Sequence, residues 1–177
     1  NSAIMAVIFA MFCMAAYILL RFRDWSFSVG AFASVAVTTL CIISFYTLLW
    51  KVLPFSMEVD QTFIAAILTI IGYSINDTVV VFDRIRETIG LYPKRDRYQV
   101  INDALNSTLS RTFNTSLTTL VVVLCIFILG GSTIRSFTFA ILLGIIVGTY
   151  STLFVATPIA YEIQKRKINK KAAEAAK

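Results

Sequence analysis

The 177-residue chain contains no histidine and only three cysteines. Without histidine the common zinc sites and a histidine proton relay are both excluded, so a carboxylate would have to carry any proton. Cys13, Cys41 and Cys125 stand in separate apolar runs, without the close spacing of a metal site. We interpret them as small buried apolar residues, and we expect neither a metal nor a cofactor.

Sequence patterns of the common enzyme classes are also missing. The chain has no phosphate-binding glycine-rich loop, no serine nucleophile elbow and no HExxH zinc motif. An intramembrane aspartyl protease would need two carboxylates at the same depth, and only Asp77 lies deep within an apolar run. We therefore do not expect an enzyme.

Apolar residues dominate what is present. They make up 58% of the chain, and the mean hydropathy is +0.78. A small water-soluble domain cannot hide that much apolar surface, whereas a helix in a bilayer can be apolar all round because its backbone groups are satisfied internally. The composition predicts an integral membrane protein.

Apolar runs long enough to cross a bilayer, which takes about 20 residues, occur five times. They cover residues 3–20, 26–50, 61–83, 112–129 and 137–161. The predicted fold is all-α, with a transmembrane bundle over residues 1–161 and a basic tail over residues 162–177. The tail is rich in lysine and alanine and has no apolar stripe, so we expect it to fray.

The basic residues lie asymmetrically between these runs. All of the 16 lysines and arginines except Lys51 and Arg135 follow the first span, join the third to the fourth, or lie in the tail. The positive-inside rule makes that side cytoplasmic, with the N-terminus outside and the C-terminus in the cytoplasm. An N-terminus outside the cytoplasm favours a further span upstream. The placement of the charges suits membrane topology, so we expect no nucleic-acid partner despite a net charge of +6.

One segment between the third and fourth spans has helical periodicity. Over residues 97–110, the apolar side chains of Tyr98, Ile101, Leu105 and Leu109 recur at helical spacing. The pattern predicts an amphipathic helix on the cytoplasmic membrane surface. A helical connector packed under the bundle is the alternative.

The third span contains the residue that is most costly to place in a membrane. An ionisable side chain within the bilayer costs a few kcal/mol, so it usually faces the bundle interior and has a partner. Asp77 lies six residues before Asp83, which is about 9 Å inside the expected cytoplasmic boundary.

Arg111, at the start of the fourth span, is the obvious cation for Asp77. The residues that follow it are unusually polar for a lipid-facing helix, and they include Asn114, Thr115 and Thr118, with Thr112, Ser116 and Thr119 broadening the stripe. We expect the third and fourth spans to face each other along this stripe. A carboxyl between a low-dielectric environment and a cation can bind and release a proton as its surroundings change.

Two interpretations of this pair stay open. In the first it is a proton pathway, formed by Asp77 and Arg111 and supported by Tyr73, Asn76, Asn114 and Thr115. In the second, Arg111 reaches the lipid headgroups and Asp77 only holds the bundle together.

Three stretches of the chain resemble the SecF family, the membrane subunit that accompanies the bacterial protein-export channel. They are IGYSINDTVVVFDRIRE (Ile71–Glu87), SRTFNTSLTTL (Ser110–Leu120) and FILGGSTIRSFTFAILLGIIVGTYSTLFVATPIA (Phe127–Ala160). The first resembles SecF more closely than the related SecD, and together the stretches extend the resemblance over nearly the whole chain.

The resemblance implies a fold of the resistance-nodulation-division type with six spans, of which this chain is similar to spans two to six. It implies an accessory role in protein export driven by the proton-motive force, with SecD and the SecYEG channel as partners. The exported polypeptide would be contacted by a periplasmic domain outside this chain. The family's Asn-Asp carboxylate and the arginine before threonine correspond to Asp77 and Arg111, which the resemblance places in the proton pathway.

One position departs from the family pattern. Many SecF proteins carry a His-Asp pair where this sequence has Val37-Thr38. A non-transporting scaffold of the translocase and a proton-driven exporter of small molecules remain as alternative functions.

Overall fold

A computed structural model describes residues 2–22, 24–52 and 59–175 of the chain. The elements are α1 (Ser2–Phe22), α2 (Trp25–Leu49), α3 (Gln61–Leu91), α4 (Arg97–Leu129), α5 (Ser132–Ser151), the π-helical turn η1 (Thr152–Ala156) and α6 (Thr157–Ala175). Because α5, η1 and α6 run on as one rod, five helical segments are long and apolar enough to cross a membrane. The predicted all-α membrane fold with five spans is confirmed.

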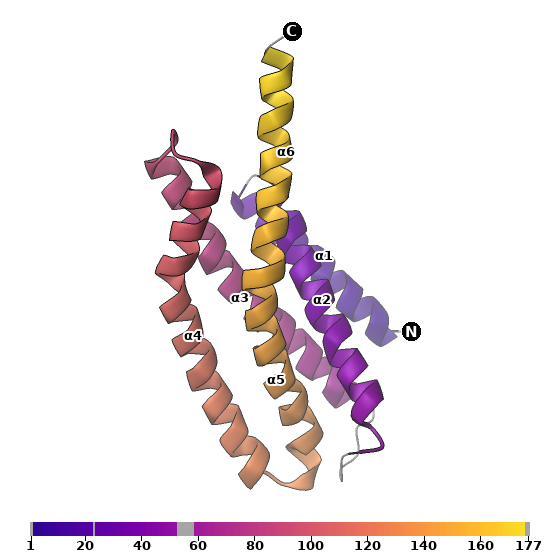
Figure 1. Ribbon diagram of the computed structural model, residues 1–177. Coiled ribbons are helices and arrows are strands. Elements are labelled where there is room, and N and C mark those ends of the chain that lie inside the picture. The colour runs from indigo at the N-terminus through magenta and orange to yellow at the C-terminus, as the bar shows by residue number, and fades with distance from the viewer. Residues whose placement is uncertain (1, 23, 53–58, 176–177) are drawn as a thin grey trace.

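Helix α3 lies at the centre of the bundle. In Figure 1 it runs behind α4 and α5, with α1 and α2 beside it, and it contacts all four. Its inner side chains are almost inaccessible: Val81 and Phe82 are 0% exposed. The Phe82 ring packs against Phe27 and Phe22, with centroid separations of 4.9 and 6.1 Å, and so joins α3 to α2 and α1.

We call one end of the bundle the basic end. It is formed by the α1–α2 junction, the α3–α4 connection and α6. Asp83 on α3 pairs with Arg21 on α1 at 3.1 Å, and Asp24 pairs with Lys167 on α6 at 3.5 Å. These pairs are partly exposed and each contributes little stability, but they join helices that are distant in sequence.

Three helices begin at an aspartate. Asp24, Asp60 and Asp96 precede α2, α3 and α4, and each carboxylate accepts a hydrogen bond from a backbone N–H of the first turn. At Asp60 the N–H of Phe63 donates at 2.8 Å, which holds the pKa of this carboxyl below its usual range. The Asp60 cap is therefore fully formed at neutral pH and weakens as the pH falls through that lowered pKa.

The amphipathic segment over residues 97–110 is not a separate surface helix. It forms the first turns of α4, which continues without a break to Leu129. Val100 and Ala104 are buried here, and Ser107 accepts a 3.0 Å hydrogen bond from Arg84 of α3. Since α3 also extends to Leu91, the two helices pack on each other beyond the predicted spans, which favours the alternative of a connector packed against the bundle.

The expected fraying of the tail is wrong through Ala175. Helix α6 continues to that residue and projects past the other helices at the basic end (Figure 1). Gln164 is still buried, so tertiary packing holds the helix for about one turn beyond the predicted span. The lysines and alanines that follow are good helix formers and extend it from there.

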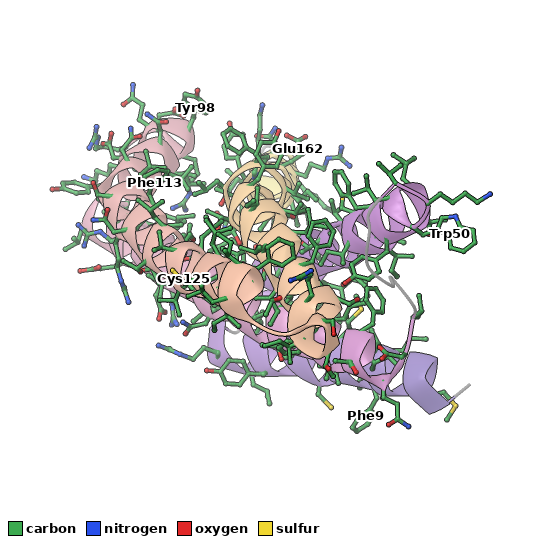
Figure 2. All side chains as sticks on the ribbon, turned by 90° about the horizontal axis from the view of Figure 1, so that it is seen from below. Phe9, Trp50, Tyr98, Phe113, Cys125 and Glu162 are labelled. Carbon is green, nitrogen blue, oxygen red and sulfur yellow. The ribbon has the colours of Figure 1, made fainter. Side chains whose placement is uncertain are left out.

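The outer surface of the bundle carries apolar side chains in every direction. Figure 2 shows Phe9 on the outer side of α1 and Trp50 at the end of α2, away from the other helices. Phe9 and Phe113 are 68% and 62% exposed. The prediction that the cysteines are buried is wrong, because Cys13 and Cys125 are exposed and Cys41 is only partly covered. A helix that is apolar all round gives no sequence signal for its inner face.

A π-helical turn interrupts the last span just before Pro158. Proline has no N–H to donate to the carbonyl of Phe154, and its ring crowds that carbonyl, so the regular helix cannot continue there. The hydroxyl of Thr157 donates to the carbonyl of Thr152 at 3.2 Å instead. The widened turn packs against α2 at Gly30, where an added Cβ would lie 2.6 Å from the carbonyl oxygen of Ala156.

This contact predicts the effect of a methyl group at position 30. Gly30→Ala should destabilise the bundle by about 1–3 kcal/mol, because a backbone carbonyl would have to move. Gly90→Ala is the matched control, since an added Cβ there meets nothing within 4 Å. Thermal unfolding of the two detergent-solubilised variants would measure the difference, and equal melting temperatures would contradict the close approach of α2 and η1.

Candidate functional site

Asp77 lies on the side of α3 that faces α4. Its Oδ1 atom accepts a hydrogen bond from the hydroxyl of Thr112 at 3.1 Å. Thr112 is 1% exposed, so the bond lies inside the bundle. Asp77 therefore has a partner on the next helix, as its place within an apolar run predicted.

The second oxygen of the Asp77 carboxylate, Oδ2, is buried without a hydrogen-bond partner. Among the described residues, four buried side-chain atoms have no hydrogen-bond partner, and three of them are Oδ2 of Asp77, Oη of Tyr73 and Oγ of Ser74. Buried polar atoms are nearly always paired, since leaving one unpaired costs free energy. Three such atoms within five residues of one helix make this part of α3 the strongest candidate for a functional site.

Hydroxyl pairs also join the helices inside the bundle. They form a seam through the interior, which we call the hydroxyl seam: Ser34–Ser151 at 3.0 Å, Thr78–Thr152 at 3.0 Å and Ser116–Thr149 at 2.7 Å. Each pair joins the α5–η1 rod to a different helix, namely α2, α3 and α4. Thr78 follows Asp77 directly, and Ser116 lies one turn after Thr112, so two of these pairs come from positions near the Asp77–Thr112 bond. Hydroxyls can act as both donors and acceptors.

Glycines on α5 allow α3 and α5 to approach each other closely. An added Cβ at Gly144 would lie 2.4 Å from the side chain of Ile70, and one at Gly148 would touch Ser74 at 3.4 Å. Small residues at this spacing are typical of close helix contacts in membranes. Gly148 therefore brings α5 against the unpaired Ser74.

Arg111 does not form an ion pair with Asp77 within the described chain. Its side chain is exposed and lines an open groove of about 430 Å³ between α3 and α4. The groove ends at Val80 and Thr108, one helical turn from Asp77 and Thr112 on the same two helices. Arg111 directly precedes Thr112, the partner of Asp77, and lines the groove between the same two helices, so Arg111 and Asp77 lie on one side of the bundle.

The structure does not bring all the predicted supporting residues to Asp77. Tyr73 is one turn away and partly buried, but Asn76, Asn114 and Thr115 are exposed on the outer face of α3 and α4. The predicted orientation of the α4 stripe is therefore wrong for Asn114 and Thr115. The parts of the stripe that face inward are Thr112 and Ser116.

Some residues of the seam carry no strong sequence signal. Single serines and threonines are common in apolar helices, and Ser34, Ser151 and Thr152 stand out only once their helices are packed. Of the departing Val37-Thr38 pair, Thr38 is buried and donates to the Ser34 carbonyl at 2.9 Å, whereas Val37 is 38% exposed. Thr38 thus borders the seam through its bond to the backbone of Ser34.

The bond from Thr112 to Asp77 generates a prediction. Thr112→Val keeps the shape of the side chain but leaves both oxygens of Asp77 without a protein donor, so it should cost about 1–3 kcal/mol of stability. Thr115→Val is the matched control, because the Thr115 hydroxyl is exposed and bonds only to the backbone of its own helix. Thermal unfolding of both variants would test this, and an equal effect of the two would contradict a buried bond to Asp77.

Comparison with known proteins agrees with the helical membrane fold. Residues 1–166 match the family described as "Protein export membrane protein SecD/SecF, C-terminal". The protein translocase subunit SecF of Rhodothermus marinus is 48% identical over 166 residues, which are 94% of this chain and 54% of the relative. The subunit of the same name from Petrotoga mobilis is 43% identical over 162 residues, which are 92% of this chain and 51% of the relative.

A solved structure is also similar. The crystal structure of SecDF in the super-membrane-facing form superimposes with a TM-score of 0.86 at 40% identity, covering 97% of this chain and 22% of that one. The chain spans about half the length of the curated relatives it matches. Family match, sequence identity and fold agree, and the chain belongs to the SecD/SecF family of protein export membrane proteins.

Proposed function

We propose that this chain is the membrane part of an accessory subunit of bacterial protein export, in which proton binding at Asp77 drives a movement of α3 against α4. The observation that carries the proposal is the cluster of unpaired buried atoms on Asp77, Tyr73 and Ser74, beside the hydroxyl seam. A carboxylate with one oxygen bonded and the other free inside an apolar bundle is suited to take up a proton. The names of the relatives support the role in protein translocation.

In this mechanism the protonation state of Asp77 sets the strength of the α3–α4 contact. The charged carboxylate attracts Arg111 and accepts from Thr112. The neutral form loses the attraction to the guanidinium, and its new O–H can donate to a hydroxyl. One charge crossing the membrane potential releases about 2.3 kcal/mol per 100 mV, which shifts a two-state equilibrium roughly 40-fold.

The groove that Arg111 lines gives this site access from the basic end. Its mouth carries Asp83, Arg84 and Glu87, and its inner end lies one turn from Asp77. Charged groups keep such a groove wet, so a proton would reach the carboxyl or leave it on this side. By the positive-inside rule this side is the cytoplasm, with the N-terminus in the periplasm and the bilayer a bacterial inner membrane.

The proposed partners follow from the family. SecD and the SecYEG channel would bind the full-length protein, and the exported polypeptide would be contacted by a periplasmic domain outside this chain. The energy source would be the proton gradient, with no bound cofactor and no enzymatic reaction. The similarity to a SecDF structure supports SecD as the direct membrane partner.

A structural role is the second candidate, and the hydroxyl seam favours it. Interhelical hydroxyl bonds hold membrane helices together at about 0.6–2 kcal/mol each. In this case Asp77 would be one more packing residue, and the protein would be a scaffold of the translocase.

Replacing the carboxylate distinguishes the two functions. Asp77→Asn in the full-length protein should reduce export in vivo strongly while leaving its abundance in the membrane near normal, because the amide keeps the acceptor for Thr112 but cannot exchange a proton. Asp103→Asn is the control, since its carboxylate is partly exposed, pairs with Arg95 at 3.1 Å and lies outside the groove. Secretion of a reporter protein and immunoblotting of membranes are the measurements.

Normal export by the Asp77→Asn protein would reject the proton-carrier role. A parallel fall in abundance and export would support the scaffold instead. Drug efflux by the wild-type protein without any change in secretion would point to the small-molecule exporter.

A further inference from the structure

A cavity of about 270 Å³ opens at the basic end, far from Asp77 along the bundle. Its lining comes from α1, the α1–α2 junction, α2, α3, α4 and α6. A site built from the ends of so many helices is defined by the tertiary structure, and the function described above does not use it.

The rim of the cavity has an excess of positive charge. Arg86, Arg97 and Lys167 line it together with one carboxylate, Asp24. Asp24 pairs with Lys167 at 3.5 Å, whereas Arg86 and Arg97 have no carboxylate partner among residues 2–22, 24–52 and 59–175. Two guanidinium groups without counter-ions, facing one cavity, attract an anion with several oxygen acceptors, and phosphate oxygens suit their geometry.

Gln164 provides an independent observation. Its side chain is 8% exposed and lines the cavity, and within the described chain its amide has no hydrogen-bond partner. Its polar atoms are not among the buried unpaired atoms of the described chain, so they reach the cavity, where the amide donor and acceptor are available to a bound molecule.

Four apolar side chains belong to the lining of the cavity, and we call them the apolar floor: Phe22, Phe27, Ile89 and Ile168. A free anion gains nothing from contact with apolar side chains, whereas the glycerol and first methylene groups of a phospholipid would cover them.

The depth of the cavity also suits a lipid. Trp25, next to Asp24, is 71% exposed, and tryptophan gathers at the headgroup level of bilayers. A neighbouring cavity shares Arg97 and is lined by Lys94, Arg95 and Lys165 against one carboxylate, Asp96. Although Arg95 pairs with Asp103, the lining keeps an excess of positive charge along the same surface.

We infer that this cavity binds the phosphodiester headgroup of an anionic phospholipid. Arg86 and Arg97 hold the phosphate oxygens, Gln164 donates its amide N–H, and the apolar floor receives the glycerol end of the acyl chains. The lipid would bridge five helical segments at the end where α3 and α4 leave the bilayer.

Native mass spectrometry of the full-length, delipidated protein tests the inference with dioleoyl-phosphatidylglycerol as the probe. Arg86→Gln combined with Arg97→Gln should weaken its binding about tenfold or more, because each removes a charge-assisted hydrogen bond. Arg166→Gln is the matched control: it removes the same charge from α6, but Arg166 is exposed and pairs with Glu162 at 3.3 Å. The control should bind like the wild type.

Gln164→Leu provides a second variant in case the double arginine variant does not fold. It keeps every charge, fills the same volume and should weaken phosphatidylglycerol binding severalfold. Equal binding of phosphatidylcholine and phosphatidylglycerol, or equal loss in the Arg166→Gln control, would overturn the inference. Binding of inorganic phosphate to the delipidated protein without any binding of phosphatidylglycerol would also overturn the inference, because that result assigns the cavity to a free anion.

Discussion

One carboxylate within an apolar bundle constrains much of this structure. In a bilayer an ionisable group has no water to hydrogen-bond, so Asp77 must be sheltered from lipid and given a donor. Both needs are met only if its helix is central, and α3 contacts α1, α2, α4 and α5. The donor comes from α4, so the position of the acid also fixes which face of α4 turns inward.

The same physical setting explains why hydroxyls and glycines organise the packing. Between membrane helices there is no hydrophobic driving force to select one face, because lipid chains are as apolar as the side chains they would displace. Specific contacts must come from small residues and polar pairs. Here the α5–η1 rod provides both: Gly144 and Gly148 admit α3, and Thr149, Ser151 and Thr152 each bond to a different helix.

The π-helical turn belongs to this arrangement as well. Pro158 ends the regular hydrogen-bond pattern of the last span, and the widened turn carries Thr152 into contact with Thr78, one residue after Asp77. Turns of this kind are frequent at functional sites, because they change the phase of the residues on either side. Because the residues after the turn are rotated relative to those before it, the α5–η1 rod can present glycines to one neighbouring helix and hydroxyls to another.

The sequence by itself determined the class of protein, the five spans and the need of Asp77 for a partner inside the bundle, because length, hydropathy and the cost of a buried charge are properties of the chain alone. It also predicted that α3 and α4 meet near Arg111. Only the tertiary structure decided that Thr112 bonds to Asp77 while Asn114 and Thr115 face outward, that Arg111 lines a groove, and that residues 97–110 continue α4. The physical reason is that a helix in lipid can be apolar on every side, so the face that turns inward is set by packing against its neighbours.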